Sequence, residues 1–274
     1  MANFGDTYVG GYVTVYDAAV NDPKPLATIT NEVTVPAGDC IDGDGTLYVV
    51  NDGFNSTGWV SEYPLGRTTA TKIITDGING PAFCAIDSRG NLWVTNINLN
   101  NVTEYLKGSS KPHTTITNGL TYADGIAIDR LGNIYVGNLG FEDGVYNVQV
   151  YPPGKKSPSR TITDGITWPV GITVDASGTL YVANLASCNI EEYRSGQGKP
   201  FREITGTNFG PVNATVNKRG RLFVADLPGA ACTKDSASSA IIEFRPNSIK
   251  PLAREITRNL EVPEGLAYYP PLLP

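Results

Sequence analysis

One short pattern recurs along the chain and constrains its fold more than any other feature. Residues 171–185 read GITVDASGTLYVANL, two alternating apolar runs around an Asp-x-x-Gly turn. Alternation with period two is typical of strands, Asp175 can bond the turn amides, and Gly178 can adopt a left-handed conformation. The pattern predicts a β-hairpin. Its copies read DGDGTLYV at 42, DSRGNLWV at 87, DRLGNIYV at 129, DASGTLYV at 175 and NKRGRLFV at 217.

Each copy is followed by two further strand-like segments. The first ends in an aromatic residue, and the second reads TKIIT, HTTIT, SRTIT, FREIT or AREIT. Four short strands in a unit of roughly 40 to 45 residues are typical of a β-propeller blade. The aromatic residues are Tyr63, Tyr105, Tyr151, Tyr193 and Phe244.

The two chain ends supply the remaining blade in this prediction. PEGLAYY at 263–269 matches a first strand that no second strand follows, and DTYVG, YVTVYD and LATIT near the N-terminus supply strands two, three and four. We therefore expect an all-β, six-bladed β-propeller of four-stranded blades, with the last blade closed by joining the N- and C-terminal strands. The repeat leaves no segment for a second domain, so we expect one domain over residues 1–274.

Composition limits the classes of partner. The net charge is −6, charged residues make up 18% of the chain, and no apolar run approaches membrane-spanning length. Basic residues fall in the predicted bottom turns without interleaved aromatic residues, which argues against nucleic acid. We expect a monomer with no membrane span. MANFGDTYVG contains no signal peptide, although such a start equally fits a mature chain with an added Met.

The four cysteines bear on the compartment. Cys40 and Cys84 lie in the first strands of neighbouring blades, and Cys188 and Cys232 lie in neighbouring loops on one face. Both pairs are eligible for disulfides, and four buried thiols are the alternative. Two disulfides would indicate a secreted or periplasmic protein.

The predicted channel mouth carries two carboxylates. In a propeller the residue before the Gly of the first strand points into the mouth of the central channel, here called the top face. Two of these residues, Asp124 and Glu264, are acidic, and they lie three blades apart. A carboxylate at this place must be solvated, paired or liganded, so both are candidates for catalysis and for binding a metal. The positions are Ala37, Ala82, Asp124, Val170, Val212 and Glu264.

A second polar ring ends the second strands on the same face. Its oxygen-bearing side chains suit a hard cation or a polyhydroxylated ligand, whereas simple turn capping is the structural alternative. Tyr122 and Trp168 fall in nearby top loops, where they fit either a ligand pocket or packing onto the blades. The ring residues are Asn51, Asn96, Asn138, Asn184 and Asp226.

The inventory of residues excludes several chemistries. His113 is the one histidine, and it falls at the bottom outer edge, so Ser-His-Asp triads, Cys-His pairs and multi-histidine zinc sites are excluded. No glycine-rich phosphate loop with Lys-Ser or Lys-Thr occurs.

The repeat carried by PVGITVDASGTLYVAN and YADGIAIDRLGNIYVGN resembles the NHL-repeat propellers over nearly the whole chain. Within that group the gluconolactonase and senescence-marker family is the most similar enzymatic family. This resemblance implies one divalent cation, with Glu264 at the family's Glu and Asp124 at its Asn, but Val170 stands where the family has Asp. The virginiamycin B lyases are also similar, but they are seven-bladed and use a catalytic histidine that this chain lacks.

Two functions from different classes follow. The first is a secreted or periplasmic module that binds a small molecule, glycan or protein at the top face. The second is a divalent-cation-dependent hydrolase of the lactonase type, with calcium as the expected cation. Binding leads, because the ligand set for a metal is incomplete.

Overall fold

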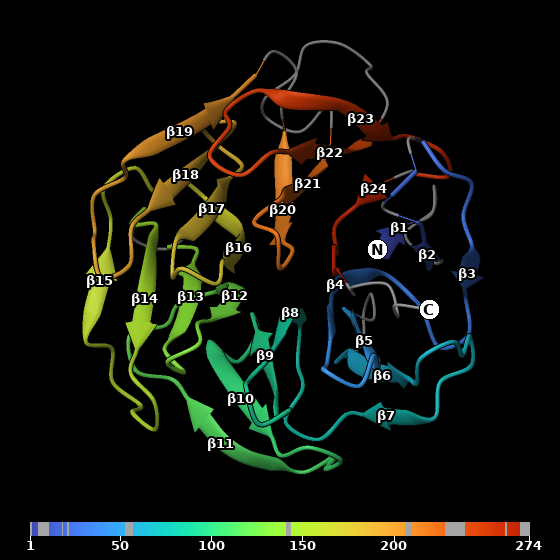
Figure 1. Cartoon of the computed structure of the whole chain (residues 1–274). Helices are drawn as coiled ribbons and strands as arrows, with labels where there is room; N and C mark the ends of the chain where they lie inside the picture. The colour runs from blue at the N-terminus through green and yellow to red at the C-terminus, as the bar shows by residue number, and fades with distance from the viewer. Residues whose placement is uncertain are drawn as a thin grey trace.

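The computed structural model describes residues 2–4, 11–17, 19–20, 22–52, 57–140, 144–206, 210–227, 239–260 and 262–268. These residues form a ring of antiparallel four-stranded sheets around a central axis, as expected for a β-propeller (Figure 1). No helix in the described part of the chain is long and apolar enough to cross a membrane.

Five complete blades account for residues 36–256. Each is a run of four consecutive antiparallel strands, with the first strand beside the axis and the fourth at the rim (Figure 1). The first two blades are β4–β7 (Pro36–Ile41, Leu47–Asn51, Trp59–Tyr63, Lys72–Ile74) and β8–β11 (Pro81–Ile86, Leu92–Asn96, Asn101–Tyr105, Pro112–Ile116). The other three are β12–β15 (Ala123–Ile128, Ile134–Asn138, Asn147–Tyr151, Arg160–Ile162), β16–β19 (Pro169–Val174, Leu180–Asn184, Asn189–Tyr193, Arg202–Thr205) and β20–β23 (Pro211–Val216, Leu222–Asp226, Ala240–Phe244, Pro251–Ile256).

The chain ends form a much smaller sheet, in the order β24-β1-β2-β3. Its strands are β24 (Val262–Pro263), β1 (Ala2–Phe4), β2 (Gly11–Val15) and β3 (Ala27–Ile29). Two residue pairs, Asn3 with Pro263 and Phe4 with Val262, join the C-terminal strand to the N-terminal one.

This corrects the expected six-bladed propeller with a closed last blade. Among the described residues the propeller has five complete blades, and no sheet closes on itself. Of the expected strand at 263–269, only Pro263 lies in a strand, β24; residues 264–268 are not in a strand, and residue 269 lies outside the described residues. The expected second strand DTYVG lies outside the described residues, and β1 is the strand that pairs with β2.

The aromatic residue that ends each third strand explains why the repeat is so regular. Tyr105, Tyr151 and Tyr193 are fully buried, and each hydroxyl donates to a backbone carbonyl in the loop that enters the same blade. Burying such a ring contributes roughly 1.5–3 kcal/mol, and the hydroxyl keeps a partner. The tyrosine thus fixes the entry loop to the blade.

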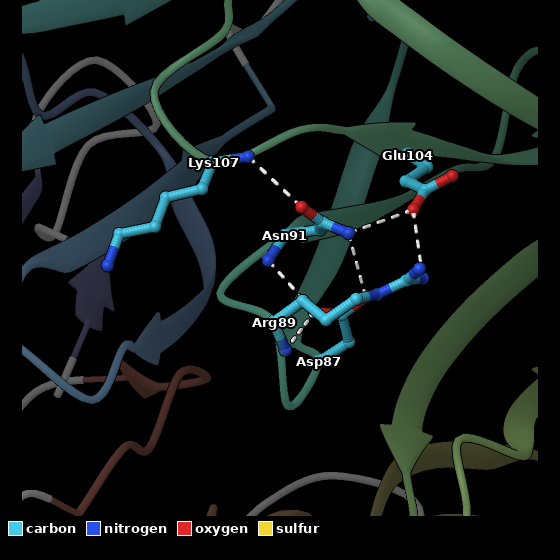
Figure 2. Close-up of polar contacts among 5 residues, drawn as sticks. All are labelled: Asp87, Arg89, Asn91, Glu104 and Lys107. Carbon is cyan, nitrogen blue, oxygen red and sulfur yellow. Dashed lines mark hydrogen bonds and ion pairs between the residues drawn. The ribbon is translucent and has the colours of Figure 1, made fainter.

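The bottom turns repeat a second device. The Asp87 carboxylate accepts the backbone amides of Arg89 and Asn91, at 2.8 and 2.9 Å (Figure 2). The Asn91 side chain donates to Asp87 and to the buried Glu104, and its carbonyl accepts the Lys107 amide (Figure 2). The same amide pattern occurs at Asp42, Asp129, Asp175 and Asn217.

The predicted Cys40–Cys84 disulfide is confirmed. It joins β4 to β8, with the two Cα atoms 5.7 Å apart. Cys188 is disulfide-bonded as well, whereas its predicted partner Cys232 lies outside the described residues.

Candidate functional site

A β-bulge in the first strand determines where the channel-mouth residues lie. In β12 the pairing with β13 runs from Ala123 opposite Asn138 directly to Ile126 opposite Val136, so Asp124 and Gly125 together oppose one residue. The first strands of the other complete blades show a register shift at the equivalent place. Bulges bend a strand and redirect side chains, here at the residue that precedes the glycine.

The glycine after the mouth residue allows neighbouring first strands to approach closely. A Cβ on Gly125 would lie 2.2 Å from the Val170 carbonyl oxygen of the next blade, and one on Gly171 would lie 2.5 Å from the Asn213 Cα. Real Cβ atoms do not come so close to backbone, so a side chain here would push the blades apart. The channel wall is therefore built from backbone packed against backbone.

Asp124 is a buried carboxylate without a polar partner. It is 7% exposed, and within the described ranges no hydrogen bond or ion pair reaches it. Burial raises its pKa to about 8, because the charged form loses water and gains nothing in exchange. In this environment the unliganded carboxyl is largely protonated at neutral pH.

Glu264 is electrostatically coupled to Asp124. Its pKa is also raised to about 8, first by burial, then by the negative charges of Asp124 and Asp52. Glu264 belongs to the segment between β24 and the C-terminus, and Asp124 to β12. The fold therefore brings the two predicted mouth carboxylates close enough to interact, from segments 140 positions apart in the sequence (264 minus 124).

The polar side chains at the ends of the second strands form hydrogen bonds within their own blades. Each amide oxygen of the four asparagines accepts a backbone N–H from the entry loop 17 residues earlier, and Asp226 accepts the Gly210 amide in the same way. The Asn184 amide also donates to the Gly165 carbonyl and to Asn189. This is the geometry of the turn-capping alternative. The ring consists of Asn51, Asn96, Asn138, Asn184 and Asp226, all buried.

Tyr122 and Trp168 occupy the turn before the first strand of their blades. Both are partly buried and have positive φ angles, 57° and 55°. Their carbonyls accept the amides of Leu139 and Leu185, at 3.0 Å in each case. Tyr122 lies two residues before Asp124 in the sequence. Phe54 and Phe141, which the repeat also predicts to fall in top loops, lie outside the described residues.

A cavity of about 240 Å³ lies below the mouth. Six segments line it: the first strands β4, β8, β12, β16 and β20, together with residues 266–268. Among the described residues that line it, Asp39, which is 5% exposed, is the one charged residue. Sequence reasoning missed it, although a signal was present: the equivalent positions hold Cys84, Ile126, Ile172 and Ala214.

The site offers a metal ion few ligands. In the described part of the chain, no group of three or more His, Cys, Asp or Glu residues could hold one. The amide oxygens of Asn138 and Asn184, expected to help, already accept backbone amides. Calcium takes six to eight oxygens, so it would need several waters or backbone carbonyls beside Asp124 and Glu264. His113 is exposed at the start of β11 and lies outside the site.

Comparisons with known proteins identify the fold only. No protein-family model matches the chain, and no curated protein matches it, so the resemblance to the NHL and gluconolactonase families gains no family match. The chain is similar to hydrazine synthase of Kuenenia stuttgartiensis, with 16% identity and a TM-score of 0.61 over 79% of this chain and 64% of that one, less than two thirds of its length. It is also similar to a chain of a nidogen/laminin complex, with 18% identity and a TM-score of 0.72 over 97% of both chains. At such identities the likeness shows a β-propeller fold and no function.

Proposed function

We propose that this β-propeller is a binding module that holds a cationic or hydroxylated small ligand at the top of its channel, between Asp124 and Glu264. The observation that carries the proposal is the Asp124 carboxylate, which is buried and has no hydrogen-bond or ion-pair partner among the described residues. Buried carboxylates are ordinarily paired, hydrogen-bonded or liganded. A ligand with a positive charge or hydroxyl donors would supply what this site lacks.

The electrostatics of the pair support the same ligand class. Burial raises the pKa values of Asp124 and Glu264 to about 8, and the negative charge of Asp124 adds to the shift of Glu264, so ionising both carboxylates is costly. A cation between them would favour the ionised form of both, whereas an anion would meet repulsion. Neutral polyols would fit by donating hydroxyl hydrogens.

We further propose a secreted or periplasmic location. The Cys40–Cys84 disulfide supports it, because such bonds persist in oxidising compartments. A glycan or a protein partner would use the same top face, and the nidogen/laminin complex among the similar structures is one case of a related fold in a protein complex.

A hydrolase of the lactonase type is the second candidate, and one observation favours it. A carboxyl with a pKa of about 8, such as Asp124, can donate or accept a proton near neutral pH, as a general acid or base must. The sparse metal ligands weigh against the cation-dependent form of this chemistry. Binding is therefore the function that the geometry supports best.

Titration calorimetry and thermal shift separate these functions. The parent and the Asp124→Asn/Glu264→Gln double variant would be tested with calcium, magnesium, manganese and zinc, then with small amines, polyols and a glycan panel. Binding in the parent that the double variant loses is the expected result. Asp76→Asn, an exposed aspartate paired with Lys111, is the matched control and should bind like the parent. If no ligand class binds, the proposal is wrong; turnover of lactones by the parent but not by the double variant would favour the hydrolase.

A further inference from the structure

The turns at the bottom of the propeller carry most of its basic residues. Because the strands of each blade are antiparallel, the turn between the first two strands and the turn between the last two lie at the same end of the sheet. The ten such turns of the complete blades hold 14 of the 21 Lys and Arg residues and 5 of the 27 Asp and Glu residues of the chain. Their net charge is therefore +9 (14 minus 5), in a chain whose total is −6. This surface, the bottom face, consists of residues 42–46, 64–71, 87–91, 106–111, 129–133, 152–159, 175–179, 194–201, 217–221 and 245–250.

Most of this positive charge is available to a partner. Four of the 14 basic residues form ion pairs: Arg89, Lys107, Lys111 and Arg221. The other ten are exposed, and none of them forms an ion pair with a described residue. The acidic residues of the face are already occupied, because the four turn aspartates accept backbone amides and Asp44 pairs with Lys107.

Negative charge at the top of the propeller does not cancel the charge at the bottom. The first three strands of each complete blade are five or six residues long, which places the two faces roughly 17–20 Å apart. This separation is about twice the screening length of about 8 Å at physiological ionic strength. A large acidic surface below the propeller would therefore be attracted, although the whole chain is acidic.

Apolar side chains are exposed in the same turns. Of the eleven large apolar side chains that are exposed in the described chain, five belong to the bottom face: Leu65, Leu106, Leu131, Phe201 and Ile249. Leu131 is 77% exposed and lies at the tip of a hairpin turn, where its amide donates to the turn aspartate. The equivalent tip residues of the other complete blades are all polar: Asp44, Arg89, Ser177 and Arg219. The turn itself therefore does not require a leucine.

We infer that the bottom face binds the surface of a lipid bilayer that contains anionic phospholipids. The basic side chains would lie at the level of the lipid phosphates, and Leu131 and the other exposed apolar side chains would enter the headgroup region. An acidic polysaccharide or a nucleic acid would match the charge alone, because a hydrated polyanion gives Leu131 no apolar environment. The inference goes beyond the proposed function and does not rest on it, since the channel mouth is on the opposite face.

Co-sedimentation of the full chain with lipid vesicles tests the inference. The vesicles contain phosphatidylcholine alone or an equimolar mixture of phosphatidylcholine and phosphatidylglycerol, and dextran sulfate is the soluble polyanion. We expect binding to the mixed vesicles only. Lys155→Gln/Lys156→Gln should weaken it about 25-fold, because each basic residue near an anionic surface strengthens binding about fivefold. Leu131→Ser, which introduces the tip residue of another blade, should weaken it about fivefold and leave the affinity for dextran sulfate unchanged.

The matched control is Leu99→Ser, at an exposed leucine in the turn between β9 and β10 on the top face. This variant should bind the mixed vesicles like the parent. Equal binding to both kinds of vesicle, or to neither, would overturn the inference. Dextran sulfate binding together with unchanged vesicle binding in Leu131→Ser would also overturn it, and would identify the bottom face as a surface for soluble polyanions.

Discussion

Asp87 and Asp124 lie at opposite ends of neighbouring first strands, and the pKa values of their carboxyl groups are shifted in opposite directions. Burial alone would raise the pKa of Asp87, but the amides of Asn91 and Arg89 outweigh it and the net pKa is lowered. Asp124 is buried without such donors, and its pKa is raised to about 8. The same residue type therefore stabilises the fold in the bottom turn and destabilises it at the channel mouth.

The difference shows that the presence of hydrogen-bond donors distinguishes a carboxylate that stabilises the fold from one that is a candidate to bind a ligand. Neither the residue type nor its position in the blade makes this distinction. The asparagine ring makes the same point on the top face itself, because the Asn184 side-chain oxygen accepts a backbone amide and its NH2 group donates to the Gly165 carbonyl. On that face the buried Asp124 carboxylate has no hydrogen-bond or ion-pair partner among the described residues.

The largest expected effect comes from removing the satisfied carboxylate. Asp87→Ala should lower the free energy of unfolding by about 2–3 kcal/mol at pH 7, because it leaves the Arg89 and Asn91 amides and the Asn91 side chain without their acceptor. Urea denaturation measures this change. Asp87→Asn keeps one acceptor oxygen and should lose less; equal losses for both variants would break the comparison.

Removing the unsatisfied carboxylate should have the opposite sign. Asp124→Asn should raise the free energy of unfolding by about 1–2 kcal/mol at pH 8.5 and leave it unchanged at pH 4. Because the pKa of Asp124 is raised to about 8 in the fold, the folded chain holds this proton longer than the unfolded chain. The parent therefore loses stability as pH rises from about 4 to about 8, and the variant should lose less. Denaturation curves at several pH values in this range measure the change of the unfolding free energy with pH. The same change in the variant as in the parent would contradict the burial of Asp124.

A smaller gain is expected at the other member of the pair. Glu264 is only partly buried, so Glu264→Gln should raise the free energy of unfolding at pH 8.5 by about 0.5–1 kcal/mol, less than Asp124→Asn does. The double variant should gain less than the sum of the singles, because removing one charge relieves the repulsion on the other. Strict additivity would mean that the two carboxylates do not interact.

The smallest effect is expected at an exposed ion pair. Asp44 contacts Lys107 at 2.6 Å, but both side chains are largely exposed. Such pairs contribute little, so Asp44→Asn should leave the urea midpoint of the parent within measurement error at every pH from 5 to 9. A clear decrease in the urea midpoint would show that solvent exposure does not predict which carboxylates stabilise this propeller.

The sequence predicted the parts of this molecule that local rules determine. The spacing of the repeat gives the length of a blade and the position of each residue within it. From these positions follow the blade strands, the turn aspartates, the tyrosines that end the third strands and the Cys40–Cys84 bond. The number of complete blades and the residues that pair at the chain ends were predicted wrongly, because β1 and β24 have three and two residues and too little pattern to fix a register. The sequence did not decide whether the ring asparagines bind a ligand or cap turns. Their partners are backbone amides of the entry loops, and every loop sequence supplies such amides. Asp39 becomes informative only when its equivalents on other blades are compared.

The Cys40–Cys84 bond changes how the chain responds to a cut. It encloses a segment that includes the exposed turn around Arg67. A protease that cleaves after Arg67 would produce two polypeptides that still migrate as one species until a reductant is added. The nicked chain would hold the two flanking inner strands together covalently. This stretch is therefore a natural place to open the chain for a circular permutant, in which the old ends are joined and the new ends lie in the first complete blade.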